Sequence, residues 1–115
     1  MANTFKLKTK DGGAVGANTD MTIYTVPSAT TTVVIGCTIA NTTASSITVD
    51  AKLENNDGDN IHIGKDLPIP SGSSLDILAG KIVMEASDIM KIQSDTANST
   101  QIAHSIMEQT SWLDL

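Results

Sequence analysis

The sequence lacks arginine altogether, has a single cysteine and carries only three aromatic side chains among its 115 residues. Its positive charge comes from seven lysines, so the planar guanidinium that commonly reads bases and clamps phosphates is missing. A single cysteine excludes an intramolecular disulfide and a cysteine-cluster metal site. Because aromatic rings are scarce, the core must consist of aliphatic side chains.

Long apolar runs are also absent. The longest near-apolar stretch is about eight residues, far short of the roughly 20 that a membrane-spanning helix needs. The first residues contain no apolar segment typical of a signal peptide, so we expect synthesis in a host cytoplasm without one. The net charge of −6 disfavours nucleic acid and anionic membranes as partners.

What the sequence does have is period-two alternation of apolar and polar residues. The length fits one domain, and 40% apolar residues suffice for one core. Alternation and β-branched runs predict nine strands, at 5–8, 21–26, 32–40, 47–54, 60–64, 74–78, 81–85, 89–94 and 101–109. Turn residues separate them, which predicts a single-domain, all-β antiparallel sandwich, jelly-roll-like, of about eight or nine short strands. The segment 32–40 is apolar or small on both faces and is predicted to be central and covered on both sides.

Three regions differ in character. Residues 1–18 are predicted to form a basic N-terminal strand or arm with a glycine-rich link, residues 19–110 the sandwich body, and residues 111–115 an apolar tail. The three lysines of the arm contribute +3, which leaves −9 for the rest of the chain. An exposed apolar tail is unfavourable in water, so it must dock on its own domain or on a neighbour. The candidate interface residues of the arm and tail are Phe5, Lys6, Lys8, Lys10, Trp112, Leu113 and Leu115.

Candidate catalytic groups are few and isolated. His62 lies on the polar face of a predicted strand, and His104 could face inward, but neither has a partner at metal-ligand spacing. Cys37 lies in an apolar run, where a buried thiol without a neighbouring cation is expected. No nucleophile and base can be paired, so we expect a protein that is not an enzyme, with no cofactor and no small-molecule substrate.

The polar loop around Asn55, Asp57 and Asp59 offers weak candidate ligands for calcium. With Gly58 at the sixth position of an EF-hand loop, the first ligand would be Leu53, so that motif is excluded. A hairpin loop is the preferred interpretation. The alternative function is a carbohydrate- or host-surface-binding sandwich in which this loop binds sugar, assisted by calcium, with Tyr24 or Trp112 as the aromatic platform.

Several segments resemble small structural proteins of tailed-bacteriophage virions. These are Tyr-Thr-Val-Pro at 24–27, the threonine-rich strand start at 30–36, Ile-Ala-Asn-Thr-Thr at 39–43, and Ile-Pro-Ser-Gly-Ser-Ser at 69–74. The segments 80–85 and 88–94 also look like that group, and the likeness covers roughly residues 20 to 110. The resemblance implies a sandwich present in many copies as a head decoration, neck or collar, tail or fibre component.

Taken with the missing catalytic groups, this resemblance suggests a structural subunit located in the virion. Its expected partners are copies of itself and neighbouring virion proteins, with no nucleic acid and no membrane. The resemblance does not tie a functional residue to any position, so the candidate interface residues come from the charge and apolarity of the two ends alone.

Overall fold

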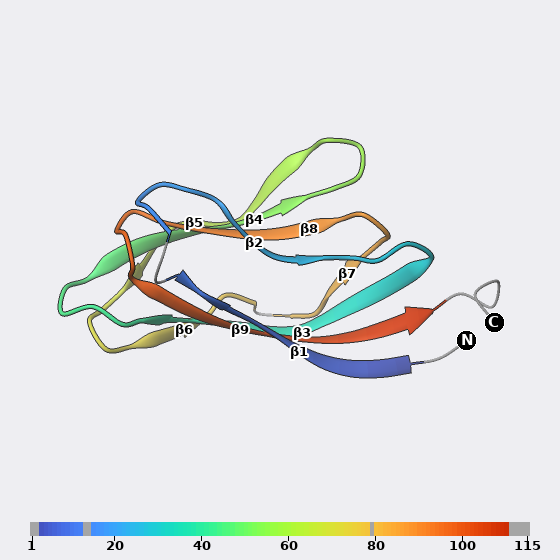
Figure 1. Ribbon diagram of the computed structural model, residues 1–115, viewed down its shortest axis with the longest axis horizontal. Coiled ribbons are helices and arrows are strands. Elements are labelled where there is room, and N and C mark those ends of the chain that lie inside the picture. Colours follow the sequence, from blue (N-terminus) through green and yellow to red (C-terminus); the bar gives the residue numbers. More distant parts are fainter. Residues whose placement is uncertain (1–2, 13–14, 79, 111–115) are drawn as a thin grey trace.

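The computed structural model describes residues 3–12, 15–78 and 80–110, and its regular elements are all strands. Two antiparallel sheets stack as layers, as Figure 1 shows. The strands are β1 (Asn3–Asp11), β2 (Met21–Thr25), β3 (Thr30–Asn41), β4 (Ile47–Glu54), β5 (Asn60–Ile69), β6 (Ser74–Asp76), β7 (Ile82–Met84), β8 (Ile89–Ser94) and β9 (Thr100–Thr110). The predicted all-β sandwich is confirmed.

The strands pair in a nested order. One sheet has the order β1-β9-β3-β6, with β7 also paired to β3, and the other has the order β2-β8-β4-β5. The first strand therefore pairs with the last, the second with β8, the third with β6 and β7, and the fourth with the fifth. This is the pattern of a long antiparallel hairpin rolled into two sheets, the jelly roll.

The core lies between the two sheets and is aliphatic, as the composition predicts. Alternation directs every second side chain of each long strand inward. Ile39 and Ile106 from the five-stranded sheet and Val49 and Ile92 from the four-stranded sheet have almost no exposed surface. No helix long and apolar enough to cross a bilayer occurs in the part of the chain that the structure describes.

Two details of the strand prediction are wrong. The strand β5 continues past residue 64 to Ile69 and includes Pro68, which an edge strand tolerates because one side of its backbone needs no partner. The strand β3 is central in its sheet but is covered on one side only. Its outward residues Thr31, Ile35 and Thr38 are exposed, because no layer packs against that face in the described structure.

Candidate assembly interface

The outer face of the five-stranded sheet is the side that points away from the core. The register of β1, β9, β3, β6 and β7 identifies the side chains on it, since cross-strand partners share a face. They are Asn3, Phe5, Leu7, Thr9 and Asp11 of β1; Gln101, Ala103, Ser105, Met107 and Gln109 of β9; Thr31, Val33, Gly36, Thr38 and Ala40 of β3, with the exposed Ile35 at the register shift; Ser74 and Asp76 of β6; and Val83 of β7. We call this surface the outer face.

One row of the outer face is apolar across four strands. Phe5 pairs with Met107, Met107 with Val33, and Val33 with Val83. We call these four side chains the apolar row. Phe5 is 74% exposed and Val83 61% exposed, so this row projects from the sheet into solvent. Next to the row along β1, Leu7 is 62% exposed.

The outer face carries almost no charge. Among the strand residues that form it, only Asp11 and Asp76 are ionisable, and both lie toward the end opposite the apolar row. Exposed large apolar side chains elsewhere in the described chain are rarer, with Ile61 on β5 as the example. A contiguous apolar patch without charge is typical of a surface that another protein covers.

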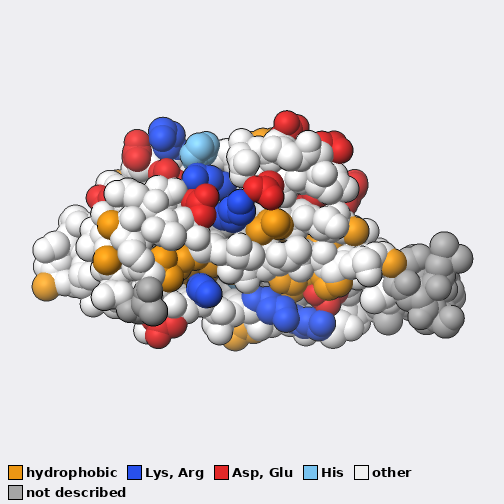
Figure 2. All heavy atoms as spheres, turned by 45° about the horizontal axis from the view of Figure 1, so that its top comes forward, with side chains coloured by type: hydrophobic (Ala, Val, Ile, Leu, Met, Phe, Trp, Pro, Cys, Tyr) orange, Lys and Arg blue, Asp and Glu red, His pale blue; other side chains and the backbone are white. Residues whose placement is uncertain are grey.

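The four-stranded sheet presents the opposite kind of surface. Half-buried charged side chains form ion pairs on it, in which Lys52 Nζ lies 3.0 Å from Oδ1 of Asp20, just before β2, and Lys91 Nζ lies 2.6 Å from Glu54 Oε1. Figure 2, in which the top of Figure 1 is turned forward, shows basic and acidic side chains gathered over this sheet. This face is suited to contact with water, so the two sides of the sandwich differ in their surface chemistry.

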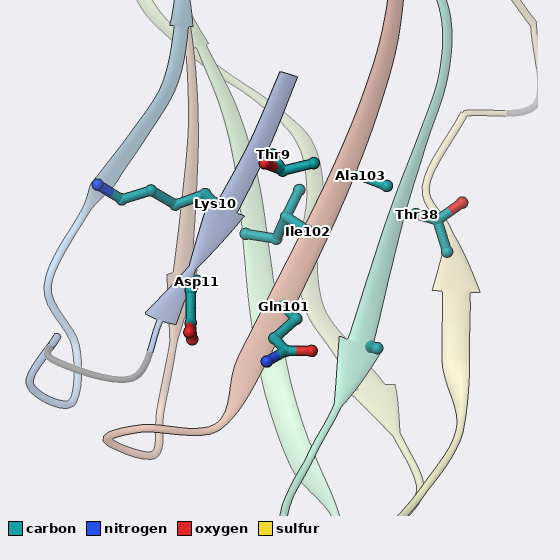
Figure 3. Close-up of a pocket in the computed structure, with 8 residues that line it drawn as sticks. Thr9, Lys10, Asp11, Thr38, Gln101, Ile102 and Ala103 are labelled. Carbon is teal, nitrogen blue, oxygen red and sulfur yellow. The ribbon is translucent and has the colours of Figure 1, made fainter. Parts of the chain in front are cut away.

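The outer face is hollowed where its side chains are small. A hollow of about 380 Å³ lies over β1, β9 and β3 and is lined by Thr9, Thr38, Ala40 and Ala103 together with Lys10, Asp11, Gln101 and Ile102. Figure 3 shows Thr9, Ala103 and Thr38 lying across these three neighbouring strands. A second hollow of about 430 Å³ lies beyond the apolar row and includes Val83, Thr31 and Gln109 in its lining. We call the first of these the small-residue hollow.

The lysines of β1 lie on the side of the sheet that faces the core. Lys6 pairs in register with buried Ile106 and Lys8 with buried His104, so both share the inward face of β9. Lys6 Nζ lies 2.6 Å from Glu108 Oε1, whose side chain is only 8% exposed. The other carboxylate oxygen of Glu108 accepts a hydrogen bond from the Tyr24 hydroxyl. Inward-pointing charge on an edge strand hinders further strand pairing at that edge.

This network sets the charge state of its members. Burial by itself raises the pKa of a carboxyl group, but the hydrogen bonds from Lys6 and Tyr24 and the charges of Lys6 and Lys8 outweigh it and hold the pKa of Glu108 below its usual value. Burial, and next the hydrogen bond to Glu108, raise the pKa of Tyr24. Glu108 is therefore an ionised carboxylate that fastens β1 to the body through Lys6.

The arm and tail predictions have different outcomes. The structure places Phe5 on the outer face and Lys10 at the rim of the small-residue hollow, while Lys6 is engaged with Glu108 of its own chain. Trp112, Leu113 and Leu115 lie outside the described residues. The sequence reasoning missed the other members of the apolar row, Met107, Val33 and Val83. A signal exists for Val33 alone, in the apolar or small character of both faces of segment 32–40, and Met107 and Val83 join it only through strand pairing.

His104 and Cys37 face each other across β9 and β3 inside the core. Both are fully buried, and neither ring nitrogen of His104 has a hydrogen-bond partner among the residues that the structure describes. Burial lowers the pKa of His104 to about 4 and, together with the charge of Asp76, raises the pKa of the Cys37 thiol to about 12. A neutral imidazole and a protonated thiol, both without access to solvent, are poor candidates for a base and a nucleophile.

The loop proposed for calcium is held together by its own hydrogen bonds. Asn55 Oδ1 accepts from the backbone N–H groups of Asp57 and Asp59, at 3.0 and 2.9 Å, and Gly58 has a φ of 93°. This is the chemistry of a tight hairpin connection, which the sequence also predicts. Among the residues that the structure describes, no group of three or more histidine, cysteine or acidic side chains is arranged to hold a metal ion. Tyr24, one of the two aromatic platforms considered for sugar, is buried and therefore unsuited to that role.

Comparisons with known proteins find similarity in structure only. No protein-family model and no curated protein matches the chain. A solved chain from Bacillus endospore appendages, described as disulfide-linked pili, matches with a TM-score of 0.55 and 14% identity over 95% of this chain and 87% of that chain. The fold is shared with a pilus protein. A chain of the infectious bursal disease virus particle matches with a TM-score of 0.55 and 10% identity over 92% of this chain.

A second structure of the same virus, from the Gx strain, gives a TM-score of 0.53 and 12% identity. This chain spans 30% and 31% of the length of those two viral chains. At sequence identities of 10–14% these matches show a shared jelly-roll fold and do not assign the function of those proteins to this chain.

Proposed function

We propose that the chain is a structural, non-enzymatic subunit of a tailed-bacteriophage virion that packs against copies of itself and neighbouring particle proteins through the outer face. The observation that carries this proposal is the contrast between the two sides of the sandwich. The outer face combines the exposed Phe5, Leu7 and Val83 with an almost complete lack of charge, whereas the opposite side carries the two ion pairs described above.

The fold supports the proposal. Similar folds occur in a pilus and in a virus particle, both of which are assembled from protein subunits. The segments that resemble tailed-phage proteins favour the virion among these assemblies. A disulfide-linked assembly is not proposed, because Cys37 is the single cysteine of the sequence and has no exposed surface.

The structure also weakens the catalytic and sugar-binding alternatives. The buried His104 has no partner that could orient it as a base, and Cys37 is held as a thiol. The carbohydrate hypothesis needs an exposed aromatic ring beside the loop at 55–60, and Tyr24 is inside the core. Trp112 is then the one aromatic side chain left of the two considered as a platform for sugar, and it lies outside the described residues.

The test is to locate the chain in purified particles. Particles produced with an epitope-tagged copy, with the tag on the charged four-stranded side, should contain the chain in many copies, and an electron-microscopy map should show a protein covering its outer face. A chain that is abundant in the infected cell but absent from purified particles would contradict the proposal. Tagging at the loop 55–60 avoids the outer face, because that loop connects β4 and β5 of the other sheet.

A further inference from the structure

We propose that the outer face pairs with the outer face of a second copy of this chain, about a two-fold axis that lies between the two sheets and runs across their strands. This inference rests on the proposed function in taking the outer face as the assembly surface. It goes further in giving the symmetry of the contact between two copies and the residues that meet in it.

The shape of the outer face is the first argument. The apolar row projects at one end, with Phe5 at 74% exposure. Four residues further along β1, the row through Thr9, Ala103 and Thr38 has small side chains, and there the small-residue hollow of about 380 Å³ opens. Projecting side chains and a hollow, whose lining is drawn in Figure 3, therefore occur on the same face, and the strand register puts them on opposite sides of the row through Leu7.

A two-fold rotation at the level of Leu7 brings these features together. It reverses the direction of the strands in the second copy and places its apolar row over the small-residue hollow of the first. Phe5 of each copy then lies over Thr9 of the other, and Met107 lies over Ala103. The same contact forms twice, which is the self-complementarity that a two-fold interface requires.

Charge is the second argument for a second copy. Each chain carries a net charge of −6, so two copies repel one another over most of their surfaces. The outer face has no lysine and only Asp11 and Asp76 among its strand residues, both at the hollow end. The rotation places these aspartates at opposite ends of the contact, far from those of the partner. Asp76 lies on the edge strand β6, where it stays at the solvated rim.

The available area is sufficient for a specific contact. Four strand positions about 4.8 Å apart and nine residues at about 3.4 Å each give a face of roughly 600 Å². Two such faces bury roughly 1,200 Å², the lower limit of standard specific interfaces. Sheets packed in this way lie about 10 Å apart, which leaves room for one layer of interdigitated side chains. Extension of the sheet through the free edge of β1 is a weaker route, because its lysines point inward.

Sedimentation equilibrium of the full chain, from about 1 to about 200 µM, tests the inference. Four variants accompany the wild type. Phe5→Lys removes the projecting ring, and Ala103→Arg fills the small-residue hollow. Ile61→Lys is the matched control, because Ile61 is 53% exposed on the other sheet. The fourth variant combines Phe5→Lys with Thr9→Asp. In the two-fold arrangement, the new lysine of each copy then lies over the new aspartate of the other copy.

We expect a concentration-dependent dimer that strengthens with added salt, since salt screens the repulsion between acidic copies. Phe5→Lys and Ala103→Arg should each weaken the dimer by roughly thirtyfold or more, the effect of losing a central anchor. Ile61→Lys should change it by less than about twofold, since isolated surface positions contribute little. The Phe5→Lys/Thr9→Asp variant should recover most of the lost affinity, which only pairing with a second copy in this register explains.

Two results overturn the inference. The wild-type chain could remain monomeric over the whole concentration range, or its dimer could resist both single outer-face substitutions. Each of these results leaves the proposed function standing if the chain is still found in particles. A dimer with the expected behaviour and no chain in particles contradicts the proposed function alone.

Discussion

Replacement of His104 by leucine tests whether the folded core keeps the imidazole of His104 neutral at acid pH. His104 has no exposed surface, and neither ring nitrogen has a hydrogen-bond partner. It faces Lys8 of β1 and Cys37 of β3 in register, and its ring centroid lies 5.9 Å from that of Tyr24. Further along the same face of β9, Glu108 is engaged with Lys6 and Tyr24. None of these contacts supplies an acceptor for an imidazolium.

The size of the effect follows from the pKa of His104, which burial lowers from 6.5 to about 4. Between these pH values the imidazole of His104 binds a proton in the unfolded chain but not in the folded chain. The free energy of unfolding therefore falls as the pH falls through this window. The difference of about 2.5 pKa units, at about 1.36 kcal/mol per unit, corresponds to roughly 3 kcal/mol. The loss is complete below pH 4 and absent above pH 6.5.

Urea unfolding of the wild type and of His104→Leu at about pH 7 and about pH 4 measures this difference. Carboxylates titrate in both proteins, so the excess loss in the wild type isolates His104. At neutral pH the leucine variant should be as stable as the wild type or more so, because it removes two buried polar atoms that lack partners. His62→Gln, at an exposed position on β5 where Nε2 lies 4.0 Å from Asp50 Oδ2, is the control for the loss of a histidine outside the core.

An equal loss of free energy in the wild type and in His104→Leu between these two pH values would refute this reasoning. The imidazole would then accept a proton in the folded state, and the core around it would have to admit water or a hydrogen-bond acceptor.

Three further predictions concern single contacts. Lys6→Met leaves the buried Glu108 without its cation. Chemical unfolding should show that the free energy of unfolding falls by about 1–2 kcal/mol. This is less than for a fully buried pair, because the Lys6 side chain is 42% exposed. Gly12→Ala would bring a methyl carbon to 2.7 Å from the hydroxyl of Thr100, which should lower the free energy of unfolding by about 1–3 kcal/mol and the melting temperature with it. Gly80→Ala is the control, because the space around Gly80 is open, and it should leave the melting temperature nearly unchanged. The thiol of Cys37, with its pKa raised to about 12 by burial, should react with a thiol reagent at about pH 8 only after unfolding.

The strands can be predicted from the sequence because each follows a local pattern, the alternation of apolar and polar residues. The alternation of Ile47, Val49 and Ala51 with polar residues predicts β4 to the residue, and the segment 89–94 matches β8. The extension of β5 through Pro68 was missed, because proline is expected to end a strand unless the strand is known to be at an edge. The position of a strand in its sheet depends on the whole topology, which periodicity does not contain.

The candidate site was harder to predict for the same reason. The pattern of β1, in which Phe5 and Leu7 alternate with lysines, suggests that the apolar side is buried and the charged side exposed. The structure has the reverse arrangement, since Lys6 reaches the buried Glu108 and Phe5 faces solvent. Glu108 lies at the far end of the chain, so only the pairing of β1 with β9 reveals why the lysine points inward.

The nested pairing of the strands also has a consequence for synthesis. The partner of β1 is β9, so the five-stranded sheet lacks the strand that joins β1 to β3 until β9 has left the ribosome. Contacts between residues so distant in sequence close slowly. During that interval the nascent chain exposes the unpaired edge of β3 and its apolar strands, so a chaperone or a slow rate of initiation should raise the yield of folded protein more than any change to the surface.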